Sequence, residues 1–326
     1  MAHLTNLKQN NIDKIILNYN ILNFIDFIPI YDGIQNSNYI INTKNKKFIL
    51  TIFEDKYVVS NINYFIKLLL FCRKYDFNCP YPIIDKNKKY ISFINSKPIC
   101  LFSFIEGQSL NYITQQNIKN VGKNLAKLHL ITNNYSHQLK TRFDFKFFDS
   151  VIKKYKPFFL KHDISLIDIF KNTLNDYKKL NNKGIPKGTI HGDLFPDNVL
   201  FNKKNQITGF LDFYFSDYNY LISDIAIVII SWCFYLDNNN NHILDFDKIN
   251  ILLKNYSKIR KIHSNEIDSL KIICKIYCMR FMFTRLIAQN NNYDNNKILQ
   301  KDPNEYVIKI LYFNNIDNFG MNINYE

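Results

Sequence analysis

The sequence predicts an α+β protein of two lobes, in which a small lobe with an antiparallel sheet precedes a larger and mainly helical lobe. Three observations support this class. The 326 residues exceed the usual length of one domain, and 47% of them are apolar, which supplies a large core. Most strand-like segments lie in the first 105 residues, whereas apolar residues recur at helical spacing in most of the remainder. We therefore place the lobes at residues 1–105 and 106–326.

The first lobe is predicted to combine a meander of antiparallel strands with two helices. Short β-branched and aromatic segments bounded by turn residues are typical of such strands. The predicted strands are Phe27–Ile30, Tyr39–Ile41, Phe48–Phe53, Tyr90–Ile94 and Ile99–Ile105. Apolar residues at helical spacing predict one helix over Asn6–Leu17 and a second over Asn61–Tyr75, which we expect Pro80 and Pro82 to end.

The second lobe is predicted to be helical on both sides of an irregular segment at residues 186–216. Its expected helices are Val121–Ile131, Leu166–Leu180, Ile225–Tyr235, Ile249–Ile259 and Glu266–Ala288. Within the irregular segment, Val199–Phe201 and Gln206–Leu211 read as a hairpin with its turn at Lys203–Asn205.

Composition excludes several classes of protein. The net charge of +14 comes mostly from lysines that are spread along the chain, with only five arginines, so we expect no nucleic-acid binding. The longest apolar segment runs from Ile225 to Leu236, which is shorter than the roughly 20 residues that a membrane helix needs. Six cysteines without metal-ligand spacing indicate free, buried thiols. These features predict a cytoplasmic protein that binds no membrane.

One segment carries the chemistry. Residues 191–198 contain the pattern His-x-Asp-x-x-x-x-Asn, and an Asp lies 14 residues beyond the Asn. Phosphoryl transfer from ATP needs a carboxylate that accepts the proton of the attacking hydroxyl, and two oxygen ligands for Mg²⁺. We assign the first role to Asp193 and the second to Asn198 and Asp212, which the predicted hairpin returns to Asn198. His191 is expected to hold the loop by hydrogen bonds.

The segment His-Gly-Asp-x-x-x-x-Asn resembles the catalytic loop of the aminoglycoside phosphotransferase superfamily of small-molecule kinases. The segments Gly122–His129 and Leu221–Ala226 are similar to two further conserved segments of that superfamily. The resemblance implies a bilobal, protein-kinase-like fold with ATP and Mg²⁺ as cofactors. It also implies that Asp224 braces the loop, and we expect His129 to be a packed core residue.

Within that superfamily, the chain is similar to the phosphotransferase-like family of homoserine kinases. The similarity is carried by Gly33–Tyr39, Phe48–Glu54, Leu211–Phe215 and Met279–Leu286, which occur in the expected order. It implies ATP-dependent phosphorylation of the hydroxyl of L-homoserine, a step of threonine biosynthesis.

The nucleotide site is expected at the start of the second strand and at the link between the lobes. Phosphate contacts are predicted from Gly33, Asn36, Ser37 and Asn38. The hinge at Phe102–Ile105 is expected to meet adenine, with Ser103 and Ile105 as binding residues. The strand position where protein kinases carry a phosphate-binding Lys holds Thr51, and Lys46 and Lys47 read as solvated hairpin residues, so the residue that replaces this Lys is unassigned.

The acceptor site follows from the chemistry of homoserine, a zwitterion. Its carboxylate is best bound by a guanidinium group, and its ammonium by a carboxylate. We assign the first role to Arg280 or Arg285, of which at most one faces the substrate, because residues five apart on a helix point about 140° from each other. For the second role the candidates are Asp197 and Asp217.

Two alternatives remain open from the residues. In the first alternative, the acceptor is not homoserine but choline, methylthioribose, a ketosamine or an aminoglycoside. An aminoglycoside site would be strongly acidic, which fits poorly with a charge of +14. The other alternative is a nucleotide-binding pseudokinase with a regulatory role, which Thr51 favours and the Asp193, Asn198 and Asp212 set opposes. The sequence does not predict the oligomeric state.

Overall fold

The computed structural model describes residues 5–30, 36–239, 241–291, 301–316 and 319, and the chain forms two compact units. The first unit is built mainly from Met1–Gly107 and Thr208–Tyr214. The second contains Gln108–Ile207, Phe215–Asn290 and the described part of Gln300–Glu326. An antiparallel sheet and many helices confirm the predicted α+β class.

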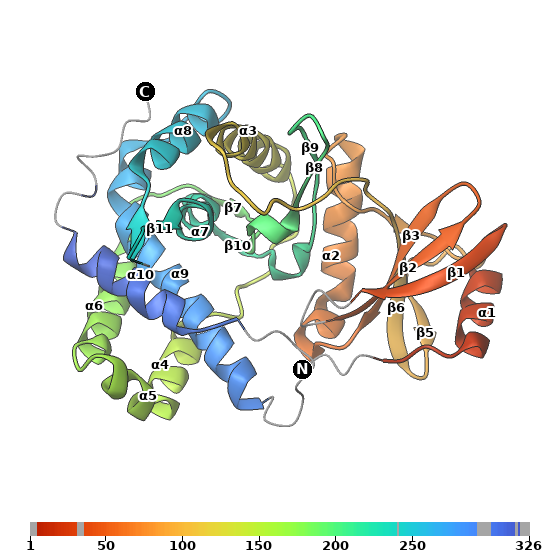
Figure 1. Ribbon diagram of the computed structural model, residues 1–326, viewed down its shortest axis with the longest axis horizontal. Coiled ribbons are helices and arrows are strands. Elements are labelled where there is room, and N and C mark those ends of the chain that lie inside the picture. Colours follow the sequence, from red (N-terminus) through yellow and green to blue (C-terminus); the bar gives the residue numbers. More distant parts are fainter. Residues whose placement is uncertain (1–4, 31–35, 240, 292–300, 317–318, 320–326) are drawn as a thin grey trace. The chain divides into compact units, whose positions relative to one another are not determined.

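An antiparallel sheet forms the centre of the first unit, with strand order β1-β2-β3-β6-β4 and β5 paired to β6 (Figure 1). Its strands are β1 (Phe24–Ile30), β2 (Asn36–Thr43), β3 (Lys47–Phe53), β4 (Pro82–Ile83), β5 (Ser92–Ile94) and β6 (Lys97–Ser103). In the central register Tyr39 lies opposite Leu50, which in turn lies opposite Leu101. All the predicted strands are present, and the short β4 was not predicted.

Two helices cover opposite faces of this sheet (Figure 1). Helix α1 (Gln9–Asn18) buries Ile12 and Ile15 against the sheet residues Tyr39, Ile41, Leu50 and Ile52, all of which share one face. Helix α2 (Lys56–Lys74) lies on the other face. There, the rings of Phe53 of β3 and Phe65 of α2 both meet the ring of Tyr214 edge-on, at 5.3 and 5.7 Å.

The ends of α2 differ from the prediction. The helix begins five residues earlier because the carboxylate of Asp55 accepts a hydrogen bond from the backbone N–H of Val58 and caps it. It ends at Lys74, where Asp76 takes a left-handed conformation with φ of 54°. Pro80 and Pro82 follow that end and do not cause it.

Helices dominate the second unit, and the strands outside the large sheet form three short pairs. The helices are α3 (Gln115–Thr132), α4 (Phe145–Lys154), α5 (Lys156–His162), α6 (Leu166–Lys179), α7 (Ile222–Trp232), α8 (Phe246–Ser257), α9 (Ser264–Asn291) and α10 (Asn304–Asn315). The strand pairs are β7 (Lys187–Thr189) with β10 (Tyr218–Tyr220), β8 (Val199–Phe201) with β9 (Ile207–Phe210), and β11 (Phe234–Leu236) with β12 (His242–Leu244).

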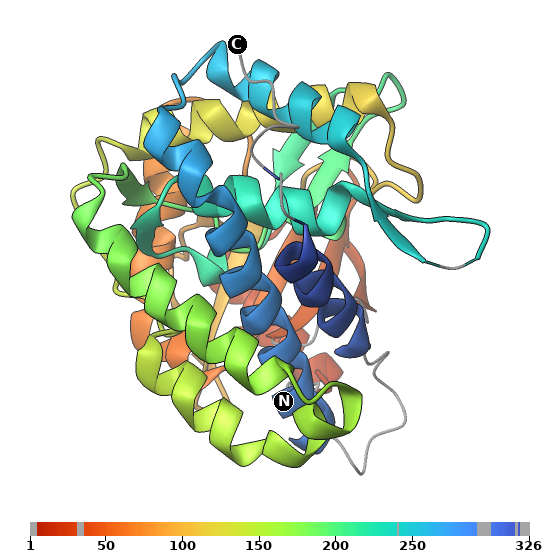
Figure 2. The ribbon, with the colours of Figure 1, turned by 90° about the vertical axis from the view of Figure 1, so that its left-hand side faces the viewer.

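Helix α9 has 28 residues, and several helices of the second unit pack along it (Figure 2). The ring of Phe283 contacts Phe148 of α4, Phe159 of α5 and Phe170 of α6, with ring centroids 5.4–5.9 Å apart. On another side, Tyr306 of α10 packs against Phe281. Helix α9 thus joins the helices that precede it to the one that follows it.

Three helices of this unit were not predicted, namely α4, α5 and α10. The predicted helix over Ile225–Tyr235 ends at Trp232, and Tyr235 lies in strand β11 instead. All six cysteines are free and buried, as predicted. Among the helices that the structure describes, none is long and apolar enough to cross a lipid bilayer.

Candidate active site

The loop that follows β7 turns sharply at Gly192. This residue takes φ of +79°, and a Cβ atom built on it would lie 2.4 Å from the carbonyl oxygen of Phe215. Only glycine fits both the conformation and the space. The amide of Asn198 closes the loop, because its Nδ2 donates to the backbone oxygen of Asp193 at 2.7 Å and to its carboxylate Oδ2 at 3.2 Å.

A buried carboxylate anchors the start of the loop. Asp224, at the first turn of α7, accepts hydrogen bonds from the backbone N–H groups of His191 and Gly192 at 2.7 and 2.8 Å. Its Oδ2 also lies 2.9 Å from Nε2 of His129, whose Nδ1 meets the hydroxyl of Tyr256 at 2.6 Å. Burial alone would raise the pKa of Asp224, but these partners, His129 above all, hold it below its ordinary value. The predicted structural roles of Asp224 and His129 are confirmed.

The guanidinium group of Arg280 lies against the same loop. Its Nη1 donates to the backbone oxygen of Gly192, and its Nη2 lies 3.6 Å from Oδ1 of Asp193. The Arg280 side chain is only 4% exposed, and that of Asp193 is 17% exposed. The sequence-predicted residues Asp193, Asn198 and Arg280 are therefore neighbours in the structure.

Burial raises the pKa of the Asp193 carboxyl to about 6, and the positive charge of Arg280 opposes that rise. Lys301 and Arg142 also lower this pKa, whereas the charge of Asp197 raises it. A carboxyl with a pKa near 6 is mostly ionised at neutral pH and is still basic enough to accept a proton from a hydroxyl group.

The two predicted metal ligands are oxygen donors, as a hard cation such as Mg²⁺ prefers. The Nδ2 atom of Asn198 is directed to Asp193, which leaves the amide oxygen as its ligand atom. Asp212 follows β9 and takes a left-handed φ of 58°. The predicted hairpin is confirmed, since β8 pairs with β9 and the N–H of Asn202 donates to the carbonyl of Gln206. That Asp212 joins Asn198 at one cation stays a prediction.

The predicted phosphate-binding residues of β2 divide between the two faces of the sheet. Ser37 lies on the α1 face, where its hydroxyl accepts from the N–H of Thr5 and donates to Glu54, each at 2.9 Å. Glu54 is also paired with Lys97 at 2.6 Å. The side chain of Ser37 therefore has a structural role.

On the opposite face, the Oδ1 of Asn38 accepts a hydrogen bond from the hydroxyl of Thr51 at 2.8 Å. The side chain of Asn36 accepts from the N–H of Glu54 at 3.3 Å. The position expected to hold a lysine is thus filled by a neutral polar pair, Thr51 with Asn38. Gly33 lies outside the described residues.

The predicted hinge residues are fixed by backbone and packing contacts. The hydroxyl of Ser103 accepts a hydrogen bond from the backbone N–H of Tyr81 at 3.1 Å. The backbone N–H of Ser103 donates to the backbone oxygen of Tyr81 at 3.0 Å. Ile105 packs on Gly209, where a Cβ atom would lie 2.7 Å from the Ile105 methyl. The ammonium of Lys47 lies 5.3 Å from the ring centre of Phe104.

Two of the predicted acceptor ligands are engaged elsewhere. The Nη1 atom of Arg285 lies 2.6 Å from both Oε2 of Glu305 and the backbone oxygen of Asp302, so this arginine joins α9 to α10. The inter-helix ion pair is a better account of Arg285 than substrate binding. Asp197 forms an ion pair with Lys301 at 2.8 Å, and both side chains are about half exposed.

Asp217 and Arg280 line one small cavity of about 20 Å³, which is room for about one water molecule. Burial raises the pKa of Asp217 to about 6, and a hydrogen bond from Thr141 opposes that rise. Within the described residues, Oδ1 of Asp217 and Nε of Arg280 have no hydrogen-bond partner. Two opposite charges with unused polar atoms therefore share a buried site.

The model of the phosphotransferase enzyme family, which includes the aminoglycoside phosphotransferases, matches residues 26–244, two thirds of the chain. The chain belongs to this phosphotransferase family.

Two homoserine kinases are similar to this chain over nearly its whole length. It is 29% identical to the homoserine kinase of Bartonella henselae over 97% of this chain and 98% of that protein. It is 28% identical to the homoserine kinase of Brucella anthropi over 97% and 96% of the two chains.

Solved structures show the same phosphotransferase fold. An amicoumacin kinase matches with a TM-score of 0.68 and 13% identity, covering 94% of this chain and 91% of its own. A spectinomycin phosphotransferase matches with a TM-score of 0.67 and 14% identity over 98% of both chains. A choline kinase of Streptococcus pneumoniae matches with 0.63 and 15% identity, over 94% and 96%. These similarities confirm the predicted bilobal, kinase-like fold class.

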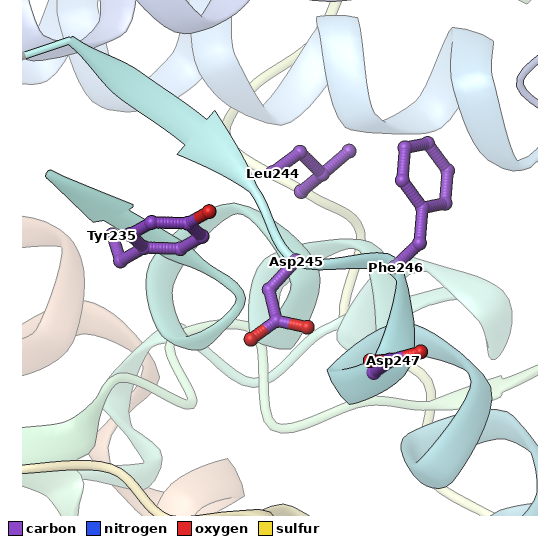
Figure 3. Close-up of a pocket in the computed structure, with 5 residues that line it drawn as sticks. All are labelled: Tyr235, Leu244, Asp245, Phe246 and Asp247. Carbon is purple, nitrogen blue, oxygen red and sulfur yellow. The ribbon is translucent and has the colours of Figure 1, made fainter. Parts of the chain in front are cut away.

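A larger hollow in this phosphotransferase lies away from the predicted residues. It has a volume of about 370 Å³ and is lined by residues of β11, β12 and the start of α8, with the carboxylates of Asp245 and Asp247 beside it (Figure 3). None of the predicted site residues lines it.

Four residues near the phosphotransferase loop were missed by the sequence analysis. Arg142 and Lys301 act on the charge of Asp193, while the rings of Phe143 and Phe215 contact Arg280 at 4.4 and 4.8 Å from its guanidinium carbon. They come from separate segments, and no spacing pattern in the sequence joins them. For Arg142, the one available signal was that the sequence has only five arginines.

Proposed function

We propose that this protein is a homoserine kinase, which transfers the γ-phosphoryl group of ATP to the hydroxyl of L-homoserine and forms O-phospho-L-homoserine. The observation that carries the proposal is the loop of Asp193, in which Asp224 holds the N–H of Gly192 while Asn198 and Arg280 lie at the Asp193 carboxylate. The homoserine kinases that are similar over the full length of the chain support the choice of acceptor. Threonine biosynthesis in the cytoplasm is the corresponding pathway and place, and we propose no nucleic-acid or membrane partner.

In this mechanism Asp193 orients the hydroxyl of the acceptor and takes its proton as the oxygen attacks the γ-phosphorus. The carboxylate is mostly ionised at neutral pH and is held in place by Asn198, so little reorganisation is needed when the acceptor binds. Asn198 and Asp212 would hold Mg²⁺, which neutralises charge on the phosphates.

The two units would divide the work between nucleotide and acceptor. We propose that residues 1–105 cover ATP and that residues 106–326 supply catalysis and bind the acceptor. Asn36 and Asn38 with the backbone of β2 are the proposed phosphate contacts, together with Gly33, and Ser103 and Ile105 are the proposed adenine contacts. The side chain of Ser37 is already engaged with Thr5 and Glu54 and contributes only its backbone.

Asp217 is the proposed partner of the acceptor's ammonium group. It is buried beside Arg280, and its Oδ1 has no partner among the described residues, so a bound cation would satisfy it. Since the present cavity admits about one water molecule, the acceptor enters only if nearby side chains move. Asp197 already pairs with Lys301 and is the weaker candidate.

A coupled assay of ADP release with a panel of acceptors tests the proposed function. The panel contains L-homoserine, choline, ethanolamine, methylthioribose, a ketosamine and an aminoglycoside, each with ATP and Mg²⁺. We expect turnover with homoserine to exceed that with every other acceptor by at least about 100-fold. Preferred use of choline or another acceptor would contradict the proposal. Nucleotide binding without any turnover would favour a pseudokinase.

A further inference from the structure

The loop that carries Asp193 is held between two opposite charges at Gly192. The anionic Asp224 accepts the N–H of Gly192 at 2.8 Å, and the cationic Arg280 donates to the carbonyl of the same residue. Arg280 also lies 3.6 Å from the carboxylate of Asp193. Each peptide group that flanks Gly192 is therefore fixed by a charge-assisted hydrogen bond, the stronger class of such bonds.

Aromatic rings pack around the planar guanidinium group of Arg280. The rings of Phe143 and Phe215 are nearly parallel, 16° apart in orientation and 6.2 Å between centres, and the guanidinium carbon lies 4.4 and 4.8 Å from those centres. Phe281 and Tyr277 of α9 contact it at 4.6 and 5.5 Å. A planar guanidinium fits such a site, whereas the ammonium of lysine has no flat face to stack.

Arg285 provides the contrast on the same helix. It lies five residues further along α9 and pairs with Glu305 of α10. Its role is to join two helices, while Arg280 reaches the catalytic loop. The two guanidinium groups thus have different partners on the same helix. Arg285 is therefore a matched control for substitutions of Arg280.

We propose that Arg280 is a positioning residue for Asp193, and not the ligand of the acceptor's carboxylate that the sequence suggested. Its two terminal nitrogens are directed to Gly192 and Asp193, and its side chain is 4% exposed. It fixes the direction of the Asp193 carboxylate toward the attacking hydroxyl. This inference rests on the proposed function.

The first test separates positioning from acceptor binding with Arg280→Lys. We expect kcat with homoserine to fall by about 10–100-fold, because a small misplacement of a reacting group costs a rate factor of this order. The KM values for homoserine and ATP should stay within about twofold of wild type. Homoserinol, which lacks the carboxylate, should lose the same factor in kcat. A rise in the KM for homoserine alone, with homoserinol unaffected, would overturn the proposal.

The second test asks whether Arg280 acts through Asp193. In an Asp193→Asn background, adding Arg280→Lys should change the residual turnover by less than about threefold, since the carboxylate that it positions is gone. An equal loss in both backgrounds would show that Arg280 only supports the fold and would overturn the proposal. Arg285→Lys, the control, should keep the wild-type kcat and lower only the midpoint of thermal unfolding.

If Arg280→Lys does not fold, Phe215→Leu removes one wall of the aromatic site and leaves the arginine in place. It should lower kcat by about threefold to tenfold with unchanged KM values, and an unchanged kcat would contradict the proposal. The proposed function is decided separately, by wild-type protein alone. If wild type prefers another acceptor, the same kcat and KM comparison is made with that acceptor.

Discussion

The start of β2 with the facing end of β3 in the first unit, and the loop around Asp193 in the second, hold their polar residues in different ways. In the strands, Asn38 and Thr51 form one neutral hydrogen bond, and the backbone is fixed by the ladder of the sheet. In the loop, no ladder is available, and the buried charged groups of Asp224 and Arg280 fix the backbone instead. The irregular backbone of the proposed catalytic loop thus depends on a few side chains, whereas a strand depends on many weak contacts.

This difference implies that single substitutions in the loop cost more than those in the strands. Removing one partner of a buried charged hydrogen bond leaves the other partner desolvated and unpaired. Removing a neutral partner beside an intact ladder leaves most of the local structure in place. We therefore expect the loss of stability to be larger for substitutions in the loop than for substitutions in the strands.

The largest effect is expected for Asp224→Asn. The amide cannot accept all the hydrogen bonds that the carboxylate accepts from His129, His191 and Gly192, so at least one buried donor loses its partner. We expect the free energy of unfolding to fall by about 3–5 kcal/mol and kcat to fall as well. Urea denaturation at neutral pH measures the first. A loss under about 1 kcal/mol would remove the contrast between the regions.

A pair of glycines gives the next effect. Gly192→Ala combines a left-handed φ with a clash against the Phe215 carbonyl, and should lower the free energy of unfolding by about 2–4 kcal/mol. Gly184→Ala has a similar φ of +61° with nothing within 4 Å of the new Cβ, and should cost about 1 kcal/mol. Thermal and urea unfolding of the two variants side by side measure the difference. Equal costs would show that Phe215 yields easily and that the loop is less constrained than described.

The smallest effect is expected in the strands, from Thr51→Val. The loss of one hydroxyl that donates to Asn38 should lower the free energy of unfolding by about 1 kcal/mol. The matched control is Thr43→Val, which removes an exposed hydroxyl that donates to the Lys46 carbonyl on the same hairpin. If Asn38 contacts phosphate, Thr51→Val should also raise the KM for ATP, while Thr43→Val should not. A cost as large as that of Asp224→Asn would break the comparison.

Much of the fold was predictable because local patterns set it. The strands of the first unit alternate between two packed faces, and the spacing of Ile62, Phe65 and Leu69 marked α2. Helices α4 and α5 are short, with ten and seven residues, and α5 buries a single residue, Phe159, so neither gives a long periodic pattern. Both pack on Phe283 of α9, a contact between distant segments. Tyr235 was placed in a helix because an apolar segment alone does not separate a helix from a following strand.

Local sequence patterns indicated some residues of the candidate site and not others. Asp193, Asn198 and Asp212 could be proposed from the sequence because phosphoryl transfer needs such groups at a short fixed spacing. The contact of Arg280 with Gly192 could not, because it joins residues 88 positions apart. Scarcity of arginine pointed to Arg280, which the structure places beside Asp193, but the same scarcity fits a substrate ligand and a positioning residue alike. Only the directions of its nitrogens distinguish the two.

The central claim is that Asp193 carries out phosphoryl transfer to homoserine. The direct measurement follows O-phosphohomoserine by ³¹P NMR for wild type and Asp193→Asn, with ATP affinity measured on both by calorimetry. The account predicts product with wild type, a rate about 10²–10⁴-fold lower with Asp193→Asn, and the same affinity for ATP in both. Near-normal product formation by Asp193→Asn, or no product from wild type that binds ATP, would contradict it.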